Sequence, residues 1–566
     1  MASAKFVRYR PVVPVVDQKP VEGSYCWDEF LEKLLIKLDR SGSVNSRCPT
    51  DVVPVECFYQ APFAEYMKYI DTSVKIEVAL FGDYDCNSEP IKLYWFARVM
   101  KVAGYRLLLR YEGMDEVGDN AYDFWVSIGS SDIRPVGYCA EKAETRALVP
   151  PEAIHKRQSN WPQYILCQIH AYRTIAINWP EIQIRKMSLS SYPFREGDYV
   201  ELLDSTVSLR VRPARVEKVI GTRIWVRVSQ VFLNQSANDR GGDSQINEGV
   251  WMDQDSPLIF PVGWALNVGY VLGANDEYIK YAKEISNELK SKSPNISHGK
   301  DGPEKTFIPR EAKDVHITWE KGMKLEVLDP LDAWKELRVS TVIEVMDDGF
   351  LRIGFDGEEM EDDSVPIHST SELLFPVGYA KKYGIKLKQP KNIEFFDWNA
   401  YLRQCNAVAA PEELFNVFTD DALSNFKIGA KLEATDMCEP HLICPATVAA
   451  HHGRLLRIQY DGWDSSYDQL FDYRCSVIIS LTGPIDFRGK DFLFCRKCKS
   501  SAHVDCVSAL CAHRPSQPGT TEPSREKRKL LFRSSNIFPL GWCEMHGYKL
   551  EAPKISYVSK KKRRKE

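Results

Sequence analysis

The 566-residue sequence lacks the features of an exported or membrane-spanning chain. No run of about 18 apolar residues occurs, so we expect no membrane span. Residues 1–17 are interrupted by Pro11 and Pro14 and contain no continuous apolar stretch, so no export signal is recognised. These absences predict a soluble intracellular protein without a membrane partner.

An excess of basic charge is also lacking, because 78 acidic residues offset 74 basic ones and leave a formal net charge of -4. Chains whose main work is wrapping nucleic acid are usually basic over a whole face. The sequence also has no phosphate-binding loop, no paired nucleophile and base, and no histidine-rich catalytic metal pattern. We therefore predict that the protein is not an enzyme and requires no cofactor.

Paired cysteines are scarce, although the chain has 15 cysteines. Most are single residues in apolar surroundings, as at Cys167, Cys405 and Cys444. In an intracellular protein such residues are typically small buried hydrophobes and not members of a disulfide framework.

The sequence contains 44% hydrophobic and 11% aromatic residues, which is enough to form several folded cores. At about 150 residues per domain its length predicts roughly four domains. Two short signals each occur four times and agree with that number. The first is an apolar residue followed by Glu77, Glu201, Glu326 or Glu433, and the second is a Pro-x-Gly-aromatic tetrapeptide at 135–138, 261–264, 376–379 and 539–542.

The two signals keep a nearly constant separation in three of the four units. From glutamate to proline it is 58, 60 and 50 residues in the first three units and 106 in the fourth. Four related units therefore follow, and the fourth carries an insertion of roughly 50 residues. The aromatic residues of the second signal, Tyr138, Trp264, Tyr379 and Trp542, recur in all units, so we expect them to pack the folded core.

Between the signals each unit has a strand-like segment, at 105–111, 223–228, 350–355 and 454–460. Short aromatic and β-branched runs bounded by turn residues predict small antiparallel barrels. Helical, aromatic arms at 27–38, 161–175 and 395–418 are expected to pack on neighbouring barrels, because one small barrel buries too little surface alone. The predicted boundaries are 1–25 for a tail, 26–150, 158–275, 306–392 and 393–554 for the units, 286–305 for a linker, about 481–530 for the insertion and 555–566 for a basic tail.

The fourth unit contains Gly-Ala-Lys-Leu-Glu-Ala-Thr-Asp at 429–436, Tyr-Asp-Gly-Trp at 460–463, Tyr-Asp at 467–468 and Phe-Pro-Leu-Gly-Trp-Cys at 538–543. The third unit matches at 322–326 and 355–357. This combination resembles the malignant-brain-tumour (MBT) repeats of chromatin proteins, and the four-repeat arrangement is similar to the nematode members. The resemblance covers residues from about 26 to 554. It implies a mainly β fold of four tandem Tudor-like barrels, each with an extended or helical arm on a neighbour.

The resemblance implies a methyl-lysine pocket in the fourth unit, made by Asp436, Tyr460, Trp463 and Tyr467. Aromatic faces attract the cation of a methylated lysine. A carboxylate accepts the remaining N–H of a mono- or dimethylated ammonium, which trimethyl-lysine lacks. The family often has Asn where this chain has Glu439, a departure that bears on fine selectivity.

The other three units do not fill all four pocket positions. The third has Asp329, Phe355, Glu358 and Asp362, and the second has Asp204, Val228, Val231 and Gln235. The first has Leu80 in place of the acid, followed by Tyr111 and Met114, with Tyr122 as an alternative ring. We expect the second and third units not to bind methyl-lysine, and the first lacks the acid.

The insertion contains the one Cys-x-x-Cys pair of the chain, Cys495 and Cys498. With Cys506 and Cys511, or with His503 or His513 as substitutes, this pair has the ligand types of a structural zinc site. Reduced cysteines in a loop are the alternative interpretation.

Residues 560–565 are consecutive basic residues, typical of a nuclear import signal or of a tail that contacts phosphates. With the family resemblance, we expect a nuclear chromatin reader that binds mono- or dimethylated lysine on histone tails and contributes to transcriptional repression. Its expected partners are methylated histone tails and chromatin-associated repressor proteins, with nucleic-acid contact through the basic tail. The alternative is a scaffold for protein partners with no dependence on methylation.

Overall fold

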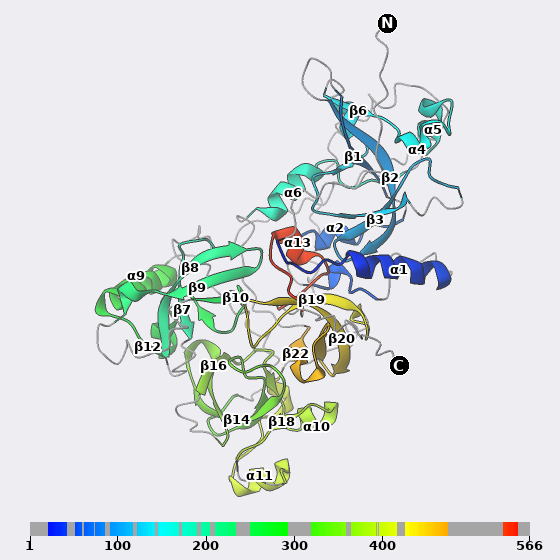
Figure 1. Ribbon diagram of the computed structural model, residues 1–566. Coiled ribbons are helices and arrows are strands. Elements are labelled where there is room, and N and C mark those ends of the chain that lie inside the picture. The colour runs from blue at the N-terminus through cyan, green and yellow to red at the C-terminus, as the bar shows by residue number, and fades with distance from the viewer. Residues whose placement is uncertain are drawn as a thin grey trace, which may run out of the picture.

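A computed structural model of the chain describes residues 21–41, 51–58, 61–72, 74–84, 91–116, 122–141, 145–168, 172–188, 194–203, 210–233, 249–291, 318–357, 364–391, 393, 395–415, 425–473 and 536–552. Four separate antiparallel sheets follow one another along this part of the chain. We number them repeats 1 to 4. Repeat 4 lies between repeats 1 and 3, and repeat 2 lies to one side (Figure 1).

The same strand order recurs in every repeat. Repeat 1 contains β1 (Lys75–Tyr84), β2 (Ile91–Ala103), β3 (Arg106–Tyr111), β4 (Phe124–Ser127), β5 (Ile133–Pro135) and β6 (Arg146–Leu148). Its sheet has the order β4-β3-β2-β1-β5, and β6 pairs with β2 in parallel. Repeat 2 contains β7 (Tyr199–Leu203), β8 (Arg210–Ile220), β9 (Arg223–Val228), β10 (Val250–Asp253), β11 (Ile259–Phe260) and β12 (Val271–Leu272). Repeat 3 contains β13 (Lys324–Val327), β14 (Leu337–Val345), β15 (Phe350–Phe355), β16 (Ser364–His368), β17 (Leu374–Phe375) and β18 (Leu387–Lys388).

Repeat 4 contains β19 (Lys431–Thr435), β20 (Ile443–His452), β21 (Leu455–Tyr460), β22 (Gln469–Asp472) and β23 (Ile537–Phe538). A parallel bridge between Ile443 and Leu550 stands where the other repeats have their sixth strand. The long second strand of every repeat has a register shift at the same place, at 99/101, 216/218, 342/344 and 448/450. Because a bulge bends and twists a strand, these shifts bend the second strand of every sheet.

The described helices are short, except in the arms. They are α1 (Asp28–Ser41), α2 (Ala64–Met67), α3 (Tyr138–Glu141), α4 (Glu152–His155), α5 (Trp161–Gln168), α6 (Trp179–Met187), α8 (Trp264–Val268), α9 (Asp276–Ser291), α10 (Tyr379–Tyr383), α11 (Trp398–Gln404) and α13 (Trp542–His546), with 3-10 turns η1 (Val55–Cys57), η4 (Gln230–Phe232), η5 (Asp347–Gly349), η6 (Glu412–Leu414) and η8 (Ser465–Tyr467). No helix in these ranges is long and apolar enough to cross a membrane.

The two sequence signals meet in space through a buried carboxylate. In repeat 4, Glu433 accepts the backbone N–H groups of Gly541 at 2.7 Å and Cys543 at 2.8 Å. Glu77, Glu201 and Glu326 accept the equivalent pairs of N–H groups at 2.7 to 2.9 Å. These donors lie at the start of the short helix after each Pro-x-Gly motif. The glutamate therefore closes each repeat by joining its first strand to its last helix.

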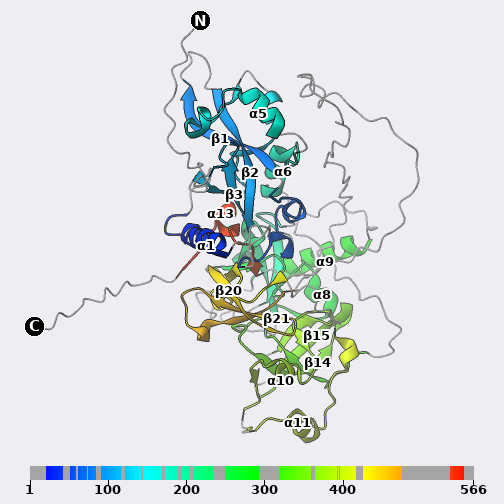
Figure 2. The same ribbon diagram turned by 90° about the vertical axis from the view of Figure 1, so that its right-hand side faces the viewer.

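The arms pack on barrels, as the sequence predicts. After repeat 3, Trp398 of α11 donates its indole N–H to Glu326 at 2.8 Å. The N-terminal arm instead packs on repeat 4, where Trp27 donates to Glu433 at 2.8 Å. Lys431 N donates to Asp51 O at 2.8 Å in the same contact. The start of the described chain therefore lies against its last repeat, with α1 beside α13 (Figure 2).

The hairpin turn of one repeat docks on the short helix of another. The Tyr379 hydroxyl of repeat 3 accepts Arg454 N at 2.8 Å and lies 3.2 Å from His452 O, both in the β20–β21 hairpin. Tyr105 N of repeat 1 donates to Leu540 O of repeat 4 at 2.9 Å, and the ring of Phe350 contacts that of Trp264 with centroids 5.0 Å apart. Trp264 and Trp542 also stack on the phenylalanine four residues earlier in their own repeat, and the Tyr379 ring lies tilted against Phe375. Trp264 and Trp542 are buried in the core, as predicted, and Tyr379 is partly buried against it. Tyr138, predicted to do the same, is only partly buried and contacts Tyr94 and Arg146.

Two expectations from the sequence need correction. Residues 286–291, interpreted as the start of a linker, belong to α9, an amphipathic helix packed on repeat 2 that the sequence analysis missed. Cys444 is buried as expected, but Cys167 and Cys405 are exposed. These two lie at the ends of short arm helices, one side of which faces solvent.

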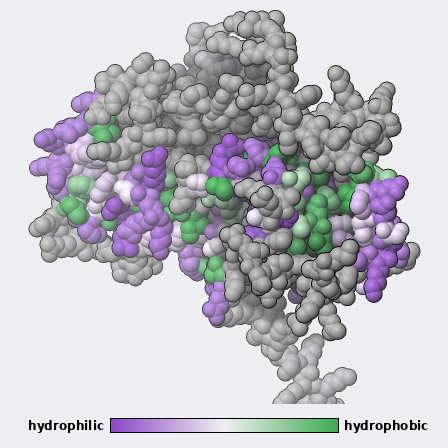
Figure 3. All heavy atoms as spheres, turned by 90° about the horizontal axis from the view of Figure 1, so that it is seen from above, coloured by the Kyte–Doolittle hydropathy of each residue, from purple (hydrophilic) through white to green (hydrophobic). Residues whose placement is uncertain are grey.

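Seen from above, the described surface has small apolar patches interspersed with hydrophilic ones (Figure 3).

The closing carboxylate generates a stability prediction. Replacing Glu433 by Ala leaves three buried donors without their acceptor, and an unsatisfied buried donor costs about 1–3 kcal/mol. We expect Glu433→Ala to lower the free energy of unfolding in urea by roughly 3 kcal/mol or more. The matched control Glu412→Ala removes an exposed carboxylate and should change little. Equal stability of the two variants would contradict this role of the glutamate.

Candidate functional site

The four predicted site residues of repeat 4 lie at or after the ends of β19 and β21, the two strands on either side of β20. Asp436 directly follows β19, Tyr460 ends β21, and Trp463 and Tyr467 lie between β21 and β22. Gly462 has a φ of 82°, which lets the chain turn back after Tyr460. Trp463 N donates to Tyr460 O at 3.1 Å across this turn.

An ion pair holds the first residue of the turn. Asp461 Oδ2 lies 2.7 Å from Lys431 Nζ, and Asp461 Oδ1 accepts the Thr447 hydroxyl at 2.5 Å. The same three residue types meet in repeat 3, at Lys324, Thr341 and Asp356. Two strands of the sheet therefore fix the backbone that carries the rings.

Gln469, the first residue of β22, joins the acid to the first ring. Its Nε2 donates to Asp436 Oδ1 at 2.8 Å, and its Oε1 lies 2.7 Å from the Tyr460 hydroxyl. That hydroxyl is also 2.6 Å from Thr435 O. Burial, and then the charge of Asp436, raise the pKa of Tyr460 well above its usual value, so its ring stays a neutral phenol. Sequence reasoning missed Gln469, because a buried glutamine at a strand start leaves no local signal.

The other two rings are open to solvent. Tyr460 is only 3% exposed, whereas Trp463 is 37% and Tyr467 46% exposed. The rings of Trp463 and Tyr467 meet edge to face, with centroids 5.4 Å apart and planes at 60°. Asp464 caps the 3-10 turn that carries Tyr467 by accepting Ser466 N at 2.9 Å. One buried ring and two exposed rings are thus positioned for a ligand that arrives from solvent.

Repeats 2 and 3 both contribute to this site. The fully buried Arg223 of repeat 2 donates to Thr435 Oγ1 at 3.0 Å and to Pro440 O, on either side of Asp436. From repeat 3, Trp334 O accepts Leu470 N of β22 at 2.6 Å. The loop that carries the acid and the strand after the rings are therefore both held from outside repeat 4. The sequence carried no signal for either contact.

A lysine of repeat 3 lies over one of the exposed rings. Lys335 Nζ is 5.2 Å from the centroid of Tyr467, which is a cation–π geometry. The Lys335 side chain is exposed and follows directly after Trp334. A cation of the chain itself thus already lies over one ring of the predicted site.

In repeat 3, Arg338 lies at the position that corresponds to the predicted pocket of repeat 4. Asp329 and Phe355 are buried, and Arg338 lies between them. Its Nη1 is 2.5 Å from Asp329 Oδ2, and its guanidinium carbon is 3.9 Å from the centroid of the Phe355 ring. Glu358 and Asp362, the other two predicted positions, lie outside the described residues. The acid and ring that remain in repeat 3 are thus already paired with an internal cation.

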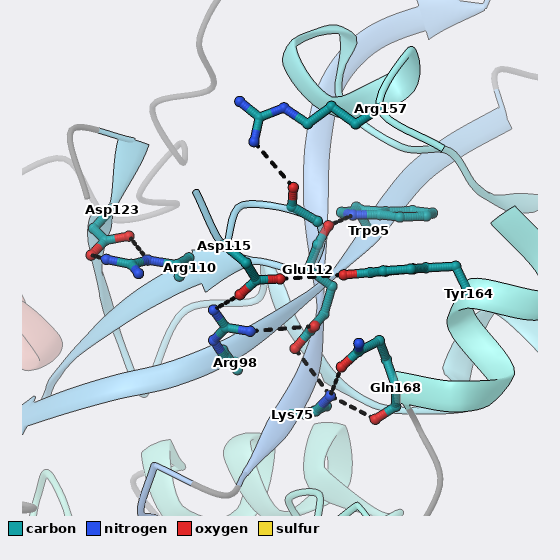
Figure 4. A network of polar contacts seen from close by, with 11 residues as sticks. Lys75, Trp95, Arg98, Arg110, Glu112, Asp115, Asp123, Arg157, Tyr164 and Gln168 are labelled. Atoms are coloured by element: carbon teal, nitrogen blue, oxygen red, sulfur yellow. Dashed lines mark hydrogen bonds and ion pairs between the residues drawn. The ribbon is translucent and has the colours of Figure 1, made fainter. Parts of the chain in front are cut away.

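Repeat 1 has a polar network of Lys75, Arg98 and Glu112, at the positions that Lys431, Thr447 and Asp461 occupy in repeat 4 (Figure 4). Trp95 donates to Glu112 O at 2.9 Å, and the Glu112 carboxylate lies 3.2 Å from Lys75 and 3.6 Å from Arg98. Arg98 also pairs with Asp115. Leu80 and Met114 are buried, and the alternative ring Tyr122 is 47% exposed, whereas Phe124 packs on Tyr111 with centroids 4.8 Å apart.

Repeat 2 keeps none of the rings at the described positions. Val228 is buried and Val231 is 74% exposed. Asp204 and Gln235 lie outside the described residues, as do Cys495, Cys498, Cys506 and Cys511 of the insertion. Zinc binding by the insertion therefore stays a prediction. Elsewhere, within the described ranges, no group of three or more His, Cys, Asp or Glu residues is arranged to hold a metal ion.

With this geometry established, comparison with known proteins identifies the repeats. A family model described as "mbt repeat" matches residues 86–155, 199–279, 323–394, 430–480 and 524–556. The chain belongs to the MBT-repeat family. Because this is a family of non-enzymatic readers, the prediction that the chain is not an enzyme is confirmed.

Relatives of this MBT-repeat chain occur in humans and in a nematode. It is 33% identical over 505 residues to MBT domain-containing protein 1 of Homo sapiens, covering 88% of this chain and 64% of the relative. It is 29% identical over 554 residues to Protein lin-61 of Caenorhabditis elegans, covering 95% of this chain and 77% of the relative. The chain thus spans just under two thirds of the length of the human relative.

A solved structure shares the whole arrangement. The crystal structure of the four MBT repeats of Drosophila melanogaster Sfmbt, in complex with the peptide RHR (me)K VLR, is 26% identical. It matches with a TM-score of 0.65 over 94% of this chain and 99% of that one. The mainly β fold of four tandem repeats, predicted from the sequence, is confirmed.

Lys335 generates a prediction about affinity. Two like charges about 4 Å apart repel by about 1 kcal/mol in water, so Lys335 opposes a cationic ligand beside Tyr467. We expect Lys335→Ala to tighten binding of a dimethyl-lysine peptide by about three- to five-fold at low salt.

The control Lys335→Arg keeps the charge and should leave the affinity near that of the unmodified protein. The gain in Lys335→Ala should shrink as salt is added, because exposed charges are screened. Weaker peptide binding in Lys335→Ala, measured by isothermal titration calorimetry, would instead make Lys335 a part of the binding surface.

Proposed function

We propose that repeat 4 binds mono- or dimethylated lysine through Asp436, Tyr460, Trp463 and Tyr467. The observation that carries this proposal is the pairing of a carboxylate with one buried ring, beside two exposed rings. Asp436 Oδ1 accepts the backbone N–H of Cys438 at 2.9 Å and Gln469 Nε2 at 2.8 Å. We assign the N–H of the ligand to the other oxygen, Oδ2.

The preference for lower methylation states follows from the carboxylate. A mono- or dimethylated ammonium keeps at least one N–H for Asp436, whereas a trimethylated ammonium has none. Unmethylated lysine is more strongly hydrated, so it loses more on entering a ring-lined site. Aromatic faces offset the remaining desolvation through cation–π attraction, worth about 2 kcal/mol or more where water is excluded.

The partner we propose is a methylated histone tail, in the nucleus, with transcriptional repression as the outcome. Support comes from the likeness to the Sfmbt repeats, whose bound peptide carries a methylated lysine. A further relative is Polycomb protein Sfmbt of Drosophila melanogaster, which is 31% identical over 75% of this chain. The basic residues at 560–565 are consistent with nuclear import and with contacts to nucleic acid.

A scaffold without methyl-lysine dependence is the second candidate. One observation favours it. In repeats 1 to 3 the described residues that correspond to the pocket of repeat 4 either lie beside a large side chain of the chain itself or are not aromatic. Four interlocked repeats also present a broad rigid surface to protein partners. The two candidates differ in whether binding depends on the Trp463 ring.

Removing Trp463 tests the proposed function. We expect the protein to bind histone-tail peptides with one or two methyl groups more tightly than peptides with none or three. Trp463→Ala removes one cation–π partner, worth about 2 kcal/mol, so the affinity should fall roughly 30-fold. Titration calorimetry measures the affinity, and the melting temperature reports folding.

Phe395→Ala serves as the matched control, because this ring is 91% exposed and lies in the arm before repeat 4. It should bind as the unmodified protein does. Binding that ignores methylation, or that survives in Trp463→Ala, would favour the scaffold function.

A further inference from the structure

One register position of the repeat distinguishes repeat 4 from the other three. This position lies on the second strand of each repeat. Its residue pairs with the residue of the first strand that directly follows the closing glutamate. The four pairs are Val78 with Trp95, Leu202 with Arg212, Val327 with Arg338 and Ala434 with Cys444. Three repeats thus have a large side chain at this position, and repeat 4 has a small one.

Repeat 3 shows what a large cation at this position does. Arg338 is 8% exposed, and its guanidinium stacks on the face of Phe355 at 3.9 Å. The same guanidinium donates to Asp329 Oδ2 at 2.5 Å, while Asp329 Oδ1 accepts the N–H of Leu331 at 2.9 Å. The arginine therefore makes the two contacts expected of a bound methylammonium, one with a ring and one with a carboxylate.

The acid and ring of repeat 4 have matching positions. Asp436 Oδ1 accepts the backbone N–H two residues later at 2.9 Å, as Asp329 Oδ1 does. Tyr460 ends the third strand of its repeat, as Phe355 does. The difference is Cys444, which is 3% exposed and too short to span the distance between ring and acid. Burial, and then the charge of Asp436, raise the pKa of the Cys444 thiol.

We propose that the residue at this register position decides whether an MBT repeat of this chain accepts a ligand cation. Arg338 is a built-in occupant that closes repeat 3, and Cys444 keeps repeat 4 open. Arg338 also marks the pose of the ligand in repeat 4, on the face of Tyr460 and against Asp436 Oδ2. This inference rests on the proposed function, and it adds the residue that selects which repeat binds.

The other two repeats are closed at the same position by different chemistry. Trp95 fills it in repeat 1, where its indole donates to Glu112 O and meets the ring of Trp161 edge to face at 5.3 Å. Arg212 fills it in repeat 2 and is 5% exposed. The same position thus carries a large buried side chain in three repeats whose other pocket residues differ.

Transferring the occupant into repeat 4 tests the inference. In Cys444→Arg the new guanidinium should lie between Asp436 and Tyr460, and binding of a dimethyl-lysine histone peptide should fall at least 100-fold. Cys444→Ala, which keeps the position small, should bind within about two-fold of the unmodified protein. The melting temperatures and circular dichroism spectra should show that both variants are folded.

A crystal structure of Cys444→Arg makes the result independent of the proposed function. A guanidinium stacked on Tyr460 and paired with Asp436 supports the inference even if the unmodified protein binds no methylated peptide, a result that would overturn only the proposed function. A guanidinium that points elsewhere, or retained peptide binding in folded Cys444→Arg, overturns the inference.

Discussion

The fold depends on one interaction repeated four times, in which a buried glutamate accepts two backbone N–H groups from the start of a short helix. A buried carboxylate is costly without partners, and the paired N–H groups offset that cost while closing each repeat. Burial nevertheless raises the pKa of Glu201 to about 7. Because the contact joins the two ends of a repeat, it does not depend on the length of chain between them. Glu433 therefore meets Gly541 although repeat 4 contains the insertion.

Contacts between repeats make the proposed site of repeat 4 depend on other parts of the array. The N-terminal arm completes the closure of repeat 4 through Trp27, and Arg223 and Trp334 reach it from repeats 2 and 3. Each of these contacts uses a buried polar group that would lack a partner in an isolated repeat. A change in repeat 2 or 3 can therefore alter the site without touching a ligand.

One scaffold supports four different environments at the same place. An indole in repeat 1, arginines in repeats 2 and 3, and a cysteine in repeat 4 share one register position. In repeat 3 the acid and ring remain, but an internal cation satisfies both. Loss of ligand access thus does not require loss of the acid or of the aromatic face.

The sequence by itself determined the number of repeats and their mainly β character, and its resemblance to the MBT family implied the four candidate residues of repeat 4. The repeats and strands follow from local patterns, because strand alternation and turn glycines are properties of a short segment. It did not predict α9 on repeat 2, nor the exposure of Cys167 and Cys405. Only the tertiary structure decided which side chains meet across 200 residues or more, as Arg223 and Thr435 do. It also placed Arg338 on Phe355 and Lys335 on Tyr467, because strand register and the docking of one repeat on another set those distances.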